Sequence, residues 1–283
     1  MYKEKWRETI DPFSLPFKHF ELKEVLGYPA AGNDVFFVKG IANGIECEAF
    51  IKSARQKGAD IEREVSVIKK LKPIMPSVIP DVLDFGKNFS VTAKMNGERL
   101  SVIAGANESL QSMEYLPDYG RTLAKLHCIK GDFEPVKDRK FFHIPSAEFF
   151  HELNNGELSY VRDYLVENAP KKQHSCFCHG DFHYANVLFH DGRLSAILDF
   201  ELSGIGNCEF DIAWAIILRP GQRFMKTEKE VRCFLDNYAT LLDYDENAVF
   251  FYMVLIYSYF YKIGRNDAEY AQFVENFFRR QIK

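Results

Sequence analysis

The sequence contains no apolar run long enough to span a bilayer. Its longest apolar stretch, residues 248–261, has the length of one buried helix. Charged side chains occupy positions 3–5, 7 and 8, where a secretory signal peptide needs an apolar segment, so we expect a cytoplasmic protein with no membrane partner. Low-complexity tracts, Pro/Ser-rich linkers and blocks of like charge are also missing, which argues against a disordered chain.

The sequence also lacks an excess of basic residues. Lysine and arginine total 36, against 40 aspartates and glutamates, for a net charge of −4. A mildly acidic chain without a basic stripe is a poor match for a nucleic-acid backbone, so we expect no nucleic-acid partner. The charge is unevenly distributed, because residues 1–97 carry net +2 and residues 98–283 carry net −6.

Cysteine is scarce. Six cysteines in 283 residues predict reduced thiols in the cytosol. Cys176-Phe177-Cys178-His179 has the residue types of a metal site, but its alternation is typical of a strand and no second ligand pair of zinc-like spacing follows. We therefore interpret this segment as a strand that enters a loop.

What is present is a core-forming composition, 47% hydrophobic, whose pattern changes along the chain. Residues 34–41 and 45–52 are β-rich and flank Asn43-Gly44, a hairpin turn signal. A helix is predicted over residues 60–71, with Ile61, Val65, Ile68 and Leu71 on one face. Short strands are predicted at residues 82–85 and 89–93.

After Gly97 helical patterns dominate, interrupted by one β-rich insert at residues 175–200. The predicted helices cover residues 119–127, 147–168, 228–242, 248–261 and 267–280. The switch from strands to helices predicts an α+β, bilobal protein. We place a small strand-rich N-terminal lobe at residues 1–95 and a larger, mainly helical lobe at residues 96–283.

The segment that carries chemistry is His179-Gly-Asp181-Phe-His183-Tyr-Ala-Asn186, followed after a hairpin by Ile197-Leu-Asp199-Phe. Phosphoryl transfer needs a carboxylate to orient the acceptor hydroxyl and accept its proton. It also needs hard oxygen ligands that hold magnesium against the phosphates. One aspartate, an asparagine and a second aspartate supply these groups.

These residues resemble the aminoglycoside phosphotransferase and choline kinase family, which has a protein-kinase-like fold. The shared pattern is His-Gly-Asp, four residues, Asn, and then an apolar strand that ends in Asp. The helix at residues 119–127 and the Asp211-Ile-Ala motif are similar to the family's flanking helices. The resemblance implies a small-molecule kinase with Asp181 as catalytic base, and with Asn186 and Asp199 as Mg²⁺ ligands. It implies ATP or GTP as the phosphate donor.

In the N-terminal part, the resemblance implies a strand lysine paired with a helix glutamate. Lys52 fits the lysine and Glu64 fits the glutamate, while the backbone of Ala93 and Met95 is expected to contact the nucleobase. The phosphate-covering loop is expected at residues 26–34, where Asn33-Asp34 replaces the Lys-Ser/Thr of a Walker motif. His179 and Asp211 are interpreted as scaffolding of the loop.

Two other functions are less consistent with these residues. A protein kinase is disfavoured because the loop lacks the arginine of His-Arg-Asp, and because Asp211 follows Asp199 too closely for an activation segment. A non-catalytic nucleotide-binding module is disfavoured because Asp181, Asn186 and Asp199 are all present.

The acceptor is expected to be a small hydroxyl compound. The net charge of −6 favours a cationic one, such as an aminoglycoside or an amino alcohol. A choline-, ethanolamine- or sugar-type acceptor is the alternative. Trp214 with Tyr257 or Tyr259 is a candidate aromatic cage for a quaternary ammonium, although aromatics on a helix are usually core.

Overall fold

The computed structural model describes residues 8–29, 32–55, 57–106, 112–153, 158–171, 174–222 and 224–282. The chain divides into two compact units. Unit 1 comprises residues 1–96 together with 195–201, and unit 2 comprises residues 97–194 and 202–283. The sequence predicts a change near residue 96, but it does not predict that 195–201 joins the N-terminal unit.

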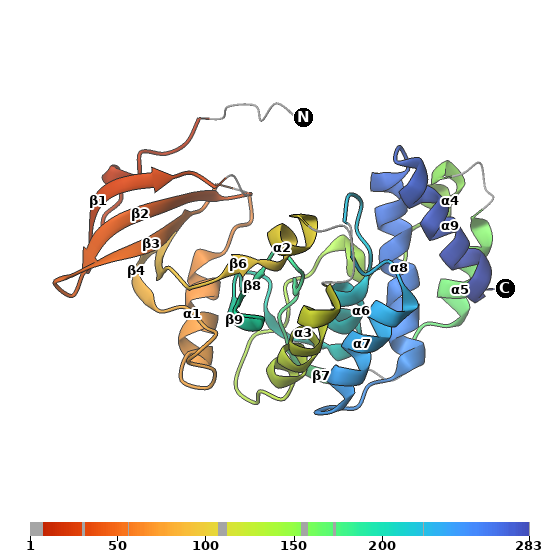
Figure 1. The fold of residues 1–283 in the computed structure, drawn as a ribbon. Coiled ribbons are helices and arrows are strands. Elements are labelled where there is room, and N and C mark those ends of the chain that lie inside the picture. The colour runs from red at the N-terminus through yellow and green to blue at the C-terminus, as the bar shows by residue number, and fades with distance from the viewer. Residues whose placement is uncertain are drawn as a thin grey trace. The chain divides into compact units, whose positions relative to one another are not determined.

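Unit 1 is built on a five-stranded antiparallel sheet in the order β1-β2-β3-β5-β4 (Figure 1). The strands are β1 (Phe20–Gly27), β2 (Asp34–Ala42), β3 (Ile45–Ser53), β4 (Val82–Gly86) and β5 (Phe89–Ala93), with a 3₁₀ helix at Pro12–Ser14. Asn43 (φ 53°) and Gly44 (φ 78°) form the predicted two-residue turn, which sets the β2–β3 register at Ala42 opposite Ile45.

Helix α1 (Ile61–Leu71) lies between β3 and β4 in the chain. Its N-cap is Asp60, whose side chain accepts a hydrogen bond from the Arg63 N–H at 3.1 Å. The predicted apolar face is confirmed, since Ile61, Val65, Ile68 and Leu71 are all buried. A separate apolar cluster of β1, β2, β3 and β5 side chains forms the core of the sheet.

Unit 2 is mainly helical. Its helices are α2 (Leu100–Ala106), α3 (Ser112–His127), α4 (Ala147–Leu153), α5 (Ser159–Glu167), α6 (Cys208–Ile216), α7 (Glu228–Ala239), α8 (Glu246–Gly264) and α9 (Ala268–Ile282), with a 3₁₀ helix at Lys140–Phe142. Helix α3 packs against α7, and α6 packs against α8. The single helix predicted over residues 147–168 is wrong, because α4 and α5 are separate helices.

Short strands complete unit 2. They are β6 (Glu98–Arg99), β7 (Ser175–Cys178), β8 (Val187–His190) and β10 (Gly204–Asn207), while β9 (Arg193–Ile197) leads into residues 195–201 of unit 1. Strand β7 pairs antiparallel with β10, and β6 pairs with β8. No helix in the described parts of the chain is long and apolar enough to cross a membrane.

Candidate active site

Within unit 1, the fold gathers three carboxylates around one lysine. Lys52 lies on β3, and its Nζ is 2.9 Å from Glu64 Oε2, 2.8 Å from Asp199 Oδ1 and 3.0 Å from Glu201 Oε2. Glu64 comes from the first turn of α1, where it is buried. The predicted pairing of Lys52 with Glu64 is therefore confirmed.

Burial and charge act against each other in this cluster. Burial alone would lower the pKa of Lys52, but the three carboxylates, Glu64 foremost, raise it well above its usual value. Burial raises the pKa of Glu64 to about 7, against the opposing attraction of Lys52. The lysine is thus held as a cation, and Glu64 is the carboxylate that fixes it from the buried side.

Asp199 is the exposed member of the cluster. Its side chain is 45% exposed, against 15% for Glu201, and its backbone adopts a left-handed conformation with φ 64°. A non-glycine residue held in this region is uncommon and stores strain, which is frequent at functional sites. Asn33 Nδ2 fixes Glu201 by donating a hydrogen bond at 3.0 Å.

Within unit 2, the loop after β7 is shaped by Gly180 and Asp211. Gly180 has φ +79°, and a Cβ at this position would lie 2.8 Å from the Leu202 carbonyl oxygen, so only glycine fits. Asp211, on the first turn of α6, accepts hydrogen bonds from the His179 N–H at 2.8 Å and the Gly180 N–H at 3.0 Å. The loop geometry is therefore fixed by a buried carboxylate.

Two further side chains, His127 and Ser203, hold Asp211 and His179 in place. His127, at the end of α3, contacts Asp211 Oδ2 through Nε2 at 3.2 Å and the Tyr238 hydroxyl through Nδ1 at 2.7 Å. Ser203 Oγ donates to the His179 carbonyl at 2.7 Å. Asp211 and His179 thus have the scaffolding contacts expected from the sequence.

The Asp181 carboxylate is held by donors on both oxygens. Trp214 Nε1 donates to Oδ1 at 2.8 Å, and Asn186 Nδ2 donates to Oδ2 at 3.3 Å. His183 Nε2 lies 3.5 Å from Oδ2, and Arg139 lies 3.6 Å from Oδ1. Burial alone would raise the pKa of Asp181, but His183 and the positive charges of Arg139 and Arg219 lower it well below its ordinary value.

The structure therefore places the predicted residues in two groups. Lys52, Glu64 and Asp199 meet in unit 1, and Asp181 and Asn186 meet in unit 2. The Asn186 amide nitrogen donates to Asp181, which leaves its carbonyl oxygen as the atom that a metal would use. Amide and exposed carboxylate oxygens fit a hard cation such as Mg²⁺.

Part of the backbone that is expected to contact a nucleobase already forms hydrogen bonds within unit 1. The Ala93 N–H donates to the Asp81 carbonyl at 2.8 Å, and the Lys94 N–H donates to the Glu48 carbonyl at 3.1 Å. The Ala93 N–H is therefore already engaged within unit 1.

A sequence model of the Phosphotransferase enzyme family (APH) matches residues 27–242. The chain belongs to this family. A curated relative, the "Probable aminoglycoside 3'-phosphotransferase" of Lactococcus lactis subsp. lactis (strain IL1403), is 21% identical over 177 residues. That match spans 58% of this chain and 66% of the relative.

Solved structures of phosphotransferases share the fold. The gentamicin complex of APH(2")-IIa superimposes with a TM-score of 0.60 at 18% identity, covering 94% of this chain and 93% of that one. The amicoumacin kinase hAmiN gives a TM-score of 0.59 at 15% identity, covering 93% and 91%. The chain therefore has the protein-kinase-like phosphotransferase fold.

Sequence reasoning missed several members of this phosphotransferase site. Glu201, two residues after Asp199, was not recognised as a partner of Lys52, and Arg139 was not singled out. Trp214 was considered only as a cage residue, yet it donates to Asp181. Its spacing from Asp211 offered a signal, because residues i and i+3 of a helix lie on one face.

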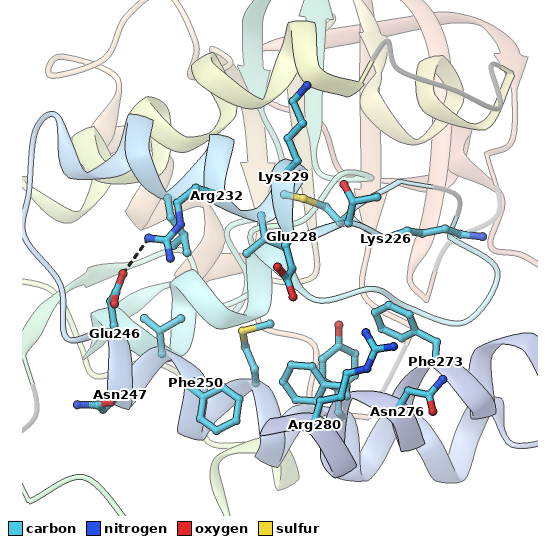
Figure 2. A pocket seen from close by; sticks show the side chains of 18 of the residues that line it. Lys226, Glu228, Lys229, Arg232, Glu246, Asn247, Phe250, Phe273, Asn276 and Arg280 are labelled. Atoms are coloured by element: carbon cyan, nitrogen blue, oxygen red, sulfur yellow. Dashed lines mark hydrogen bonds and ion pairs between the residues drawn. The ribbon is translucent and has the colours of Figure 1, made fainter. Parts of the chain in front are cut away.

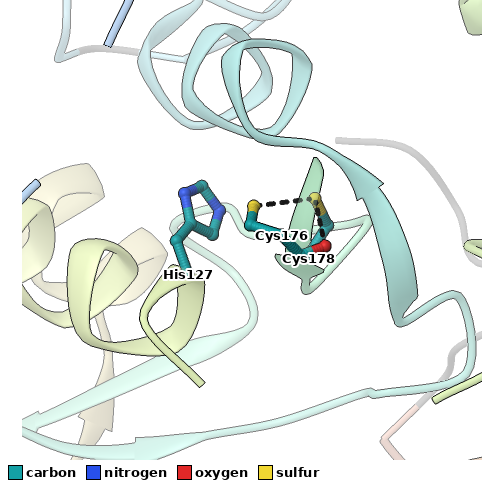
Figure 3. A group of neighbouring side chains, drawn as sticks. All are labelled: His127, Cys176 and Cys178. Atoms are coloured by element: carbon teal, nitrogen blue, oxygen red, sulfur yellow. Dashed lines mark hydrogen bonds between the residues drawn. The ribbon is translucent and has the colours of Figure 1, made fainter. Parts of the chain in front are cut away.

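Two cysteines of β7 lie close to a histidine at the end of α3. Ligand atoms of His127, Cys176 and Cys178 lie within 4.8 Å of one another (Figure 3). Both ring nitrogens of His127 are engaged in hydrogen bonds, Nε2 with Asp211 and Nδ1 with the Tyr238 hydroxyl, so neither is available to a metal.

Cys176 is joined to Cys208 in a disulfide, with the Cα atoms 5.8 Å apart. The expectation of six thiols is thus corrected. The two residues meet because β10, which pairs with β7, runs directly into α6.

Unit 2 also contains a cavity of about 1060 Å³ lined by residues of α7, α8 and α9 and of the segment before α7 (Figure 2). Its lining includes the apolar rings of Phe250 and Phe277 and the charged side chains of Lys229 and Arg280. None of the residues predicted for catalysis or nucleotide binding lines it.

Proposed function

We propose that this phosphotransferase moves the γ-phosphate of ATP or GTP onto a hydroxyl of a small molecule. The observation that carries the proposal is Asp181, a largely buried carboxylate that hydrogen-bond donors and nearby cations keep ionised. An ionised carboxylate fixed in one rotamer is suited to orient a hydroxyl and to accept its proton.

In the proposed reaction, the acceptor oxygen forms a bond to the γ-phosphorus while the bond from that phosphorus to the bridging oxygen breaks. The hydroxyl proton passes to Asp181, and the nucleoside diphosphate leaves with the electron pair of the broken bond. Lys52 contributes its fixed positive charge to the donor phosphates, and Glu64 keeps it in place.

Asn186 and Asp199 are the proposed holders of Mg²⁺, which neutralises phosphate charge when bound. The Met95 N–H and the backbone of Ala93 are the proposed contacts of the nucleobase. ATP as donor is supported by the solved streptomycin–ATP complex of APH(2")-IIa, which has this fold. GTP stays open as a donor.

The acceptor class is proposed from two sources. The net charge of −6 over residues 98–283 favours a compound with ammonium groups. The curated relative's name points to an aminoglycoside. One solved structure with this fold is that of a macrolide 2'-phosphotransferase, so a macrolide hydroxyl is a further candidate. A sugar acceptor stays the alternative.

The test is nucleotide turnover with a panel of aminoglycosides, amino alcohols, sugars and hydroxy acids. Release of ADP or GDP that requires both magnesium and an acceptor supports the proposal. Identification of a phosphomonoester by mass spectrometry completes it. If nucleotide binds but no acceptor is phosphorylated, the chain is a nucleotide-binding module.

A further inference from the structure

The immediate surroundings of Asp181 are cationic, in contrast to the acidic charge of the unit as a whole. Arg139 lies 3.6 Å from the carboxylate and also donates to the Gly180 carbonyl. A second guanidinium, that of Arg219, is buried nearby and donates to the Trp214 carbonyl at 2.6 Å. Local charge acts on the reacting end of an acceptor, whereas net charge acts on its approach.

Arg139 occupies an aromatic box. Its guanidinium carbon lies 4.0 Å from the ring centroid of Trp214, 5.5 Å from those of Phe142 and Phe210, and 5.8 Å from that of Phe141. Rings at such distances attract a cation through their negative faces, which is how proteins bind quaternary ammonium groups. Here a side chain of the protein itself fills the box.

The segment that carries Arg139 is firmly anchored. Pro135 forms a bridge with Ile205, the Val136 N–H donates to the Ile205 carbonyl at 2.9 Å, and the Lys137 N–H donates to the Leu202 carbonyl at 3.2 Å. The Arg139 side chain is 15% exposed. The guanidinium is therefore held in a fixed position in the site and is not a mobile surface group.

We propose that Arg139 determines acceptor specificity: by filling the aromatic box beside Asp181, it excludes acceptors with an ammonium group next to the reacting hydroxyl. The atoms of the acceptor beside that hydroxyl are then oxygen-bearing and uncharged or anionic. Acceptors of the choline and ethanolamine type are excluded, while ammonium groups farther from the reacting hydroxyl are tolerated. The inference rests on the proposed function and narrows its substrate class.

Removal of Arg139 should convert the box into a receptor for quaternary ammonium. Arg139→Ala leaves the four rings in place and removes the guanidinium that lies 3.6 Å from Asp181. Burial already lowers the pKa of Arg139, with Asp181 acting in the opposite direction, so the site holds this cation against a solvation cost. An external trimethylammonium group would take over the same contacts.

The experiment measures choline binding by the fluorescence of Trp214, in a Trp6→Phe background that leaves Trp214 as the only tryptophan. Choline should bind Arg139→Ala at least about 10-fold more tightly than the parent, as expected for a cation inside several aromatic rings. Arg193→Ala removes an exposed arginine of the same unit and should bind choline as the parent does.

Two outcomes would overturn the proposal. One is choline binding by the parent as tight as that by Arg139→Ala. The other is a folded Arg139→Ala, with parental circular dichroism and nucleotide affinity, that gains no choline affinity. If Arg139→Ala does not fold, Arg139→Gln keeps a donor for the Gly180 carbonyl without the charge, and it must show the gain instead. The experiment measures choline binding and not turnover. A negative result would therefore contradict the role of Arg139 without bearing on the proposed kinase activity.

Discussion

At the scale of single residues, the two aspartates of the motif have different surroundings and therefore different expected roles. Asp181 is enclosed by donors, whereas Asp199 is exposed and pairs with Lys52. Asp181→Asn should lower kcat about 10²- to 10⁴-fold and change nucleotide affinity less than about twofold, because the base acts on the acceptor proton. Asp199→Ala should weaken magnesium-nucleotide binding by at least about 10-fold.

The measurements are kcat with the best acceptor and nucleotide Kd by calorimetry in the presence of magnesium. Asp191→Asn makes the same chemical change at an exposed carboxylate and should leave both quantities unchanged. Equal losses of nucleotide affinity in Asp181→Asn and Asp199→Ala would show that the two roles are wrongly assigned.

The lowered pKa of Asp181 predicts the pH profile. A base is active when deprotonated, so kcat/KM falls as pH drops through its pKa. Burial raises this pKa, but His183, Arg139 and Arg219 lower it further than burial raises it. We expect kcat/KM to stay level from about pH 8 to about pH 5, unlike an enzyme whose base is poised near neutrality.

A fall in kcat/KM between about pH 8 and about pH 5 would contradict the assignment of an always-ionised base at Asp181. The measurement is kcat/KM of the parent protein as a function of pH.

At the scale of elements, the turn from β7 into the loop decides where Asp181 points. Gly180→Ala adds a methyl group 2.8 Å from the Leu202 carbonyl oxygen at φ +79°. We expect a loss of about 1–2 kcal/mol of stability from the backbone conformation alone, and a further loss from the clash. We also expect kcat to fall at least about 10-fold, because the neighbouring carboxylate is displaced.

Gly44→Ala is the matched control. Gly44 has φ +78°, but a Cβ there meets nothing within 4 Å. Thermal unfolding should show the conformational cost alone in Gly44→Ala, with kcat unchanged. Equal destabilisation and equal activity in the two variants would mean that the close approach to Leu202 has no effect on the loop.

At the scale of the whole molecule, the division of charge bears on how the acceptor arrives. The excess of −6 over residues 98–283 should steer a compound with ammonium groups. Its KM should rise as added salt shortens the Debye length from about 10 Å to about 3 Å. The measurement is KM at low and high salt with nucleotide saturating.

A neutral sugar would show little dependence on salt and serves as the comparison. A best acceptor that is neutral, or whose KM does not change with salt, would rule out a cationic acceptor. The proposed kinase chemistry would be unaffected, because it depends on Asp181, Asn186 and Asp199.

The amino-acid sequence by itself determined the local features. The Asn43-Gly44 turn, the face of α1 and the supporting role of Asp211 follow from turn chemistry, helical periodicity and motif spacing, all of which act over a few residues. The pairing of Lys52 with Glu64 was also predicted, because the family resemblance implies a strand lysine paired with a glutamate of the next helix, and Glu64 matches that pattern better than Glu62.

Only the tertiary structure decided what surrounds the two aspartates. Arg139 reaches Asp181 from a segment about 40 residues away, and Glu201 joins Lys52 because residues 195–201 pack with unit 1. The Cys176–Cys208 disulfide likewise depends on β10 running into α6. Such contacts arise from chain packing over long sequence distances, which neither periodicity nor motif spacing records. The local charge beside Asp181 is therefore opposite in sign to the net charge read from the sequence.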